Sequence, residues 1–160
     1  MSNYLIPLMV IVPMLCAILV NAFAKFNKSI KVLTFVVAIC LPIIPLISNY
    51  GLHFFGGYTP MVDNVTGVIY HPAITYSFDM LQQIFIAAIG LITFLVAFIY
   101  LSKYKKASGQ YLFLLFMGTA SVTALMLTDD IFNMFVFFEI LALVQVGIVI
   151  ASPMDYSYEM

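Results

Sequence analysis

The sequence carries very little charge. Lys, Arg, Asp and Glu make up 8% of the 160 residues, whereas a soluble globular domain carries about 25%. Hydrophobic residues make up 64%, and the mean hydropathy is +1.13. This composition excludes a soluble domain and predicts an all-α integral membrane protein, because backbone groups in lipid need partners within their own segment.

Several chemical signatures are also missing. The two cysteines, Cys16 and Cys40, form no Cys-x-x-Cys motif, and both lie in apolar runs. They are therefore interpreted as small buried side chains rather than a redox, iron–sulfur or nickel–iron site. No glycine-rich phosphate motif or basic groove is present, so neither nucleotide nor nucleic-acid binding is predicted. We expect no cofactor and no metal in this chain. No basic residue precedes the first apolar run, so we expect a mature span rather than a cleaved signal peptide.

Five apolar stretches are long enough to cross a hydrocarbon layer of about 30 Å. They are residues 5–24, 30–50, 78–101, 110–127 and 131–151. We predict a single membrane domain, residues 1–160, with one long loop at residues 51–77. Glycine and proline punctuate that loop around short runs at residues 58–62 and 68–70, which predicts a small β-hairpin.

All six basic residues are lysines, and they cluster after the first and third predicted spans. The clusters are Lys25, Lys28 and Lys31, and Lys103, Lys105 and Lys106. Alternating spans place both clusters on one side of the membrane, and the positive-inside rule makes that side cytoplasmic. We therefore predict a multi-pass protein of the cell membrane. Its N-terminus and long loop would lie outside, and its C-terminus in the cytoplasm.

Glu139 is the only charged residue between Ile131 and Ala151. It follows Asp130 by nine residues, or about 13 Å of helix, which places it near the membrane midplane. A charge at that depth costs roughly 2.5–3.5 kcal/mol and usually marks an ion or proton path. The helix neighbours on its face are apolar, so its polar partner must come from elsewhere. Glu139 is predicted to be a relay carboxylate; a protonated structural glutamate is the alternative.

Four further residues are candidates to support Glu139. Thr119, Ser121 and Thr123 of the fourth predicted span could offer hydroxyls or hold water. Helix packing by small residues is the favoured alternative for them. Asp130 marks the outer entry of the last span. We expect no catalytic residue in the chain, which would not be an enzyme on its own.

The stretch from Asp130 to Glu139, with the sequence DIFNMFVFFE, closely resembles a motif of antiporter-like membrane subunits. These subunits occur in complex I, in multisubunit Mrp Na⁺/H⁺ antiporters and in energy-converting membrane-bound nickel–iron hydrogenases. The loop at residues 56–58 and the segment at residues 78–81 also look like the family. In that family the glutamate of the ion path lies on the fifth span, as Glu139 does. The resemblance implies H⁺ or Na⁺ translocation at Glu139.

Family members have more spans than these five and pair the glutamate with a lysine within the membrane. None of the six lysines here lies deep within a predicted span. The resemblance therefore implies the N-terminal five-helix part of such a subunit, or a split subunit, with another membrane subunit supplying the lysine. It implies a prokaryotic redox-driven pump of hydrogenase type, whose peripheral hydrogenase and iron–sulfur module would be partners. An Mrp-type antiporter subunit without a redox partner and a non-conducting scaffold are the alternatives.

Overall fold

The computed structural model describes residues 5–49, 51–56, 61–62, 69–70, 74–104 and 108–151. Within these residues, five helices are each long and apolar enough to cross a membrane. They are α1 (Leu5–Ala22), α2 (Asn27–Ile47), α3 (Met80–Lys103), α4 (Gly109–Leu127) and α5 (Ile131–Ala151). Their ends lie within a few residues of the predicted spans, because a run of apolar side chains long enough for the bilayer is itself the signal.

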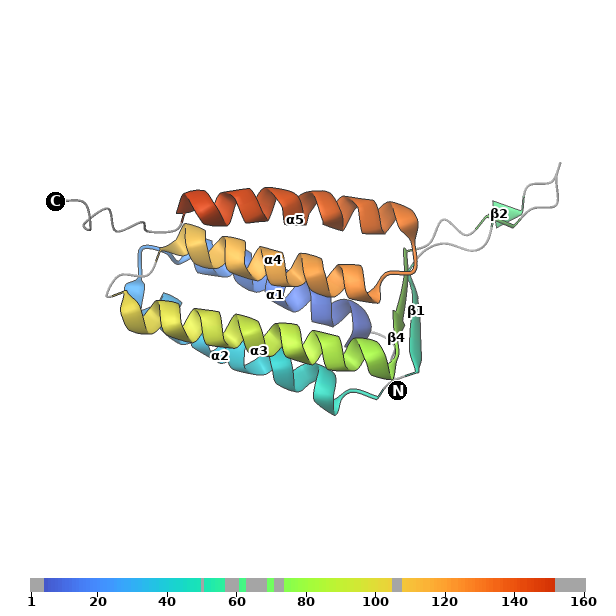
Figure 1. The fold of residues 1–160 in the computed structure, drawn as a ribbon, viewed down its shortest axis with the longest axis horizontal. Helices are drawn as coiled ribbons and strands as arrows, with labels where there is room; N and C mark the ends of the chain where they lie inside the picture. The colour runs from blue at the N-terminus through green and yellow to red at the C-terminus, as the bar shows by residue number, and fades with distance from the viewer. Residues whose placement is uncertain are drawn as a thin grey trace.

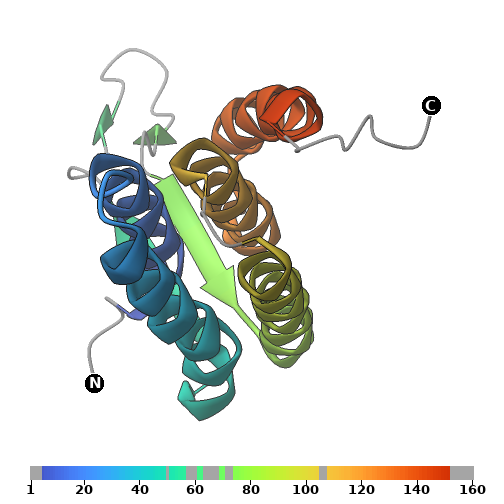
Figure 2. The ribbon, with the colours of Figure 1, turned by 90° about the vertical axis from the view of Figure 1, so that its left-hand side faces the viewer.

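The first four helices form a bundle with α5 at its edge (Figures 1 and 2). Helix α2 packs on α3, α1 packs on α4, and the contacts α3–α4 and α1–α2 close the bundle. Helix α5 packs mainly on α4. The buried apolar side chains fall into two clusters, one around Phe116 and Tyr100 and the other around Phe78 and Ile86. Both clusters draw on several of the first four helices.

Short strands follow α2. Strand β1 (Leu52–Gly56) pairs antiparallel with β4 (Ile74–Phe78), and β2 (Met61–Val62) pairs with β3 (Ile69–Tyr70). Strands β2 and β3 lie within the two runs that were predicted to form a hairpin. Residues 58–60 and 68 and the turn between the strands lie outside the described residues, so the outer hairpin stays a prediction. The longer β1–β4 pair was not predicted from the sequence. Strand β4 crosses one end of the bundle (Figure 2).

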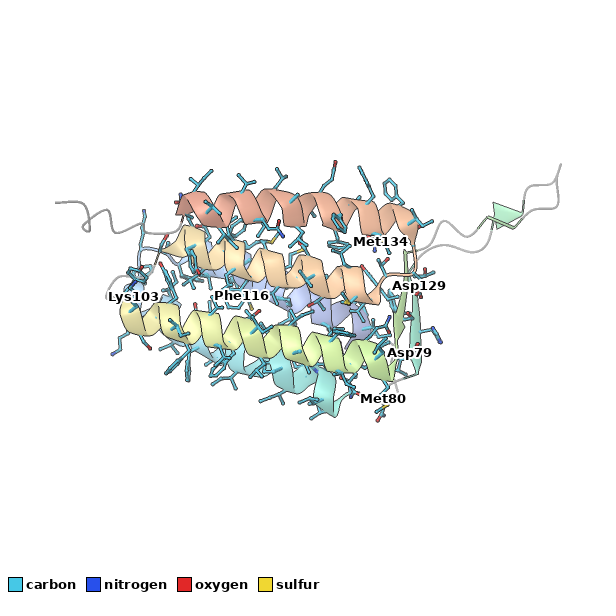
Figure 3. All side chains as sticks on the ribbon, in the orientation of Figure 1. Asp79, Met80, Lys103, Phe116, Asp129 and Met134 are labelled. Carbon is cyan, nitrogen blue, oxygen red and sulfur yellow. The ribbon has the colours of Figure 1, made fainter. Side chains whose placement is uncertain are left out.

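Lys103 lies at one end of the bundle, and Asp79 and Asp129 lie at the other (Figure 3). Helix α2 begins three residues before the predicted span, at Asn27, so Lys31 belongs to its first turns. The Lys31 ammonium donates to the carbonyl oxygen of Tyr104 at 3.1 Å and that of Leu101 at 3.5 Å. A cation is favourable at these carbonyls because they end helix α3. Lys31 thus ties the start of α2 to the end of α3.

Helices α2 and α3 approach each other closely at Gly90. A Cβ atom at Gly90 would lie 2.6 Å from the backbone nitrogen of Pro42 and 2.7 Å from the carbonyl carbon of Leu41. Both are backbone atoms, which cannot move aside as the tip of a side chain can. Glycine at this position therefore sets the distance between the two helices.

Candidate functional site

Glu139 lies nine residues into the 21-residue helix α5, about 12 Å from its start at about 1.5 Å per residue. The helix is long enough to span a membrane, and this position is close to the middle of the helix. The side chain is exposed. In the part of the chain that the structure describes, it has no hydrogen bond and no ion pair. Glu139 is therefore a carboxyl group on the outside of the bundle, near the middle of a helix long enough to span a membrane.

A shallow, almost wholly apolar groove of about 360 Å³ lies on the exposed face of α5, and Glu139 is one of its lining residues. Two rows of side chains spaced four residues apart form it: Ile131, Phe135 and Glu139 in one row, and Met134, Phe138 and Ala142 in the other. Rows with this spacing are the ridges between which a neighbouring helix packs. The groove thus has a shape that can receive a neighbouring helix. Glu139 is the one ionisable residue in its lining.

The opposite side of α5 packs on α4 through small residues. A Cβ at Gly118 of α4 would lie 3.1 Å from a methyl carbon of Val144, and one at Gly147 of α5 would lie 3.0 Å from a methyl carbon of Leu114. Val144 and Asn133 are the buried residues of α5. Small residues bring the two helices together on this side and leave the Glu139 side outward.

Asp130 caps the start of α5. Its two carboxylate oxygens each accept a hydrogen bond at 3.2 Å, from the backbone N–H groups of Phe132 and Asn133. The backbone N–H of Asp130 donates to the hydroxyl of Thr128 at 3.3 Å. An acidic side chain is favourable there because it meets the unpaired N–H groups and positive end of the helix. The structure places Asp130 at the helix start, about 13 Å along the axis from Glu139.

A buried hydrogen-bond network beside this cap was missed from the sequence. The side-chain amide of Asn133 donates to the hydroxyls of Tyr76 at 3.3 Å and Thr128 at 3.1 Å. The carboxylate of Asp129 accepts from the hydroxyl of Ser77 at 2.8 Å. The position of Asn133, a polar residue within an apolar span, could have indicated that its side chain has a hydrogen-bond partner. Its partner Tyr76 lies on β4, however, which is far away in the sequence.

The hydroxyls predicted to support Glu139 lie inside the bundle. Thr119, Ser121 and Thr123 are all buried. The Thr119 and Thr93 hydroxyl oxygens are 2.9 Å apart, and the Ser121 hydroxyl donates to the carbonyl of Met117 at 2.9 Å. Thr119 and Thr123 line a small pocket among α1, α2, α3 and α4. No hydrogen bond joins any of the three to Glu139 within the described residues.

Cys16 and Cys40 are free thiols, the first buried and the second exposed. Cys16 belongs to the buried cluster around Phe116. Within the described ranges, no group of three or more His, Cys, Asp or Glu side chains is placed to hold a metal ion.

No protein-family model matches the chain. A curated protein of Methanocaldococcus jannaschii, uncharacterized protein MJ1309, is 37% identical to it over 159 residues. The alignment covers 98% of this chain and 31% of MJ1309, so the chain spans about a third of the length of that relative.

The fold is similar to that of a chain in a solved structure of the membrane-bound sulfane sulfur reductase, an archaeal respiratory membrane complex. The TM-score is 0.67 and the identity 20%, over 96% of this chain and 31% of the other. The likeness shows that this five-helix arrangement occurs in a known membrane protein.

Proposed function

We propose that this chain is an ion-translocating membrane subunit, or part of one, in a respiratory membrane complex, and that Glu139 passes H⁺ or Na⁺. One observation carries the proposal: the only charge of α5 lies mid-helix on an apolar face that the rest of the bundle leaves exposed. An uncompensated carboxylate in lipid is unfavourable, so another protein surface or a water-filled path must meet it.

A membrane helix that carries a basic side chain is the proposed cover for this face. The two rows of the groove fit a helix, and a lysine placed beside Glu139 would compensate its charge. Movement or titration of that lysine would change the proton affinity of Glu139, which is what a relay needs. MJ1309 and the solved chain both extend well beyond the segment that aligns with this chain, which leaves length for such a cover in each.

The fold neighbour favours a redox-driven complex over an antiporter without a redox partner, since it comes from a respiratory complex. The neighbour is a sulfane sulfur reductase, so the hydrogenase type stays a prediction from the sequence. Purification of the intact complex from its host distinguishes these classes. Iron–sulfur and hydrogenase or reductase subunits would accompany the chain in a redox complex, whereas only membrane subunits would accompany it in an antiporter.

Glu139→Gln tests the proposal because it keeps the shape of the side chain and removes the charge. In membrane vesicles that contain the assembled complex, we expect the variant to lose ion transport while electron transfer and assembly persist. Asp130→Asn is the matched control: it also removes one carboxylate from the same segment, but asparagine still caps the helix, so transport should persist.

Normal ion transport by the assembled Gln variant would contradict the proposal and support the scaffold alternative. The same conclusion would follow if the assembled complex showed Glu139 packed among apolar side chains, with neither water nor a basic residue beside it.

A further inference from the structure

The pocket among the first four helices is small. Its volume is about 10 Å³, counted as space open to the centre of a water molecule, which is about what one water needs. Three helices each contribute a pair of lining residues: Met9 and Pro13 of α1, Leu41 and Pro45 of α2, and Thr119 and Thr123 of α4. The residues that line the pocket come from α1, α2, α3 and α4, and none comes from α5.

Two prolines free two carbonyl groups at this pocket. Proline has no N–H, so Pro13 leaves the carbonyl of Met9, four residues earlier, without its helical partner, and Pro45 does the same to Leu41. Met9 and Leu41 both line the pocket. The peptide group between Leu41 and Pro42 lies against α3, since a Cβ added at Gly90, another pocket residue, would lie 2.9 Å from the Leu41 oxygen. Two pocket-lining residues, one from each helix, thus have a carbonyl that lacks its usual helical donor.

Thr123 supplies a hydroxyl that the chain itself does not pair. The residue is 3% exposed, it lines the pocket, and its hydroxyl has no hydrogen-bond partner among the described residues. Neighbouring hydroxyls differ: Thr119 donates to the carbonyl of Leu115 at 2.9 Å, and Ser121 is bonded within its own helix. The pocket lining therefore combines a hydroxyl without a partner with two residues whose carbonyls lack their helical donor.

We propose that this pocket binds one water molecule, which donates to the carbonyls of Met9 and Leu41 and accepts from the hydroxyl of Thr123. Three hydrogen bonds are typical of a buried water. The water links α1, α2 and α4, and it satisfies acceptors that would otherwise be costly inside a membrane protein. A sodium ion fits these groups less well because every lining residue is neutral, so nothing would offset its charge.

A high-resolution structure of the intact complex that contains this chain tests the site directly. We expect one density peak within hydrogen-bond distance of the two carbonyls and the Thr123 hydroxyl, in sodium and potassium buffers alike. Thr123→Ser should keep the peak and Thr123→Val should lose it. A pocket without density, in a map that shows other buried waters, would overturn the proposal. So would a peak present only in sodium.

Thermal stability provides a second, independent test with a matched control. Thr34 on α2 is also buried, at 0% exposed, and its hydroxyl also lacks a partner, but it lies outside the pocket. In the intact complex, we expect Thr123→Val to lower the unfolding midpoint by about 2–4 °C, through loss of a buried hydrogen bond. Thr34→Val should leave the midpoint unchanged or raise it. Equal effects of the two substitutions would show that no water depends on Thr123.

Discussion

Helices α4 and α5 are neighbours of similar length, yet they bury very different shares of their residues. In the most apolar 18-residue window, 44% of residues are buried in α4 but 6% in α5. Exposed apolar side chains on α5 would not by themselves imply a protein partner, because lipid accommodates such side chains. The difference matters because α5 also exposes a carboxylate, Glu139, which lipid does not accommodate.

The comparison separates two roles within one chain. The first four helices pair many of their polar groups with one another, through contacts such as Thr93 with Thr119 and Lys31 with the end of α3. Helix α5 is fixed to that bundle on one side and presents an unmet charge on the other. The four-helix bundle supports α5. We expect the outward face of α5 to contact another protein.

The largest expected effect is the loss of stability caused by Gly90→Ala, which disturbs the packing of the four-helix bundle. The added Cβ would lie 2.6 Å from the backbone of Pro42, and overpacking of this kind typically costs about 1–3 kcal/mol. Gly147→Ala is the matched change on α5. Its Cβ meets only the flexible tip of Leu114, at 3.0 Å, and alanine gains about 0.5–1 kcal/mol over glycine within a helix. Heating in detergent followed by size-exclusion chromatography should show much greater loss of Gly90→Ala protein; equal loss would contradict the close α2–α3 approach.

Asn133→Ala should loosen α5 from the four-helix bundle. The change removes two hydrogen bonds and leaves the buried hydroxyl of Tyr76 short of a partner, at a cost of about 1–3 kcal/mol. Amide hydrogen exchange should accelerate in Ile131–Ala151 more than in α1–α4. Gln145→Ala, on the exposed side of the same helix, is the control and should leave exchange unchanged. Faster exchange throughout the chain would instead mean that the network supports the whole fold.

The smallest effect on the chain itself is expected from Phe138→Ala. This ring is 63% exposed in the Glu139 groove, so truncation should change the stability of the purified chain by less than about 0.5 kcal/mol. Recovery of the other membrane subunits in a pull-down should nevertheless fall. Phe98→Ala on α3, where the ring is 50% exposed, is the control and should leave recovery intact. Equal recovery with both variants would show that the α5 face is not a special contact surface.

Much of the fold could be predicted because each span is a local property of the sequence. Apolar length gives the five helices, and helical geometry gives the apolar neighbours of Glu139. The orientation of Thr119 and Thr123 could not be obtained this way. A helix that is apolar all round carries no pattern to say which side faces its neighbours. The pairing of β4 with β1, and the contact of Asn133 with Tyr76, depend on residues far apart in sequence.

The contacts of α5 also fix the position of Glu139 along the bundle. Asn133 is bonded near one end of the helix, and Gly147 meets Leu114 near the other. A shift of α5 by one residue in its register against α4 would move the Glu139 side chain by about 1.5 Å along the axis. The same shift would rotate it by about 100° around the axis. Both contacts would then be lost. The bundle therefore holds the Glu139 side chain at one position along its length and in one direction, toward whatever packs against α5.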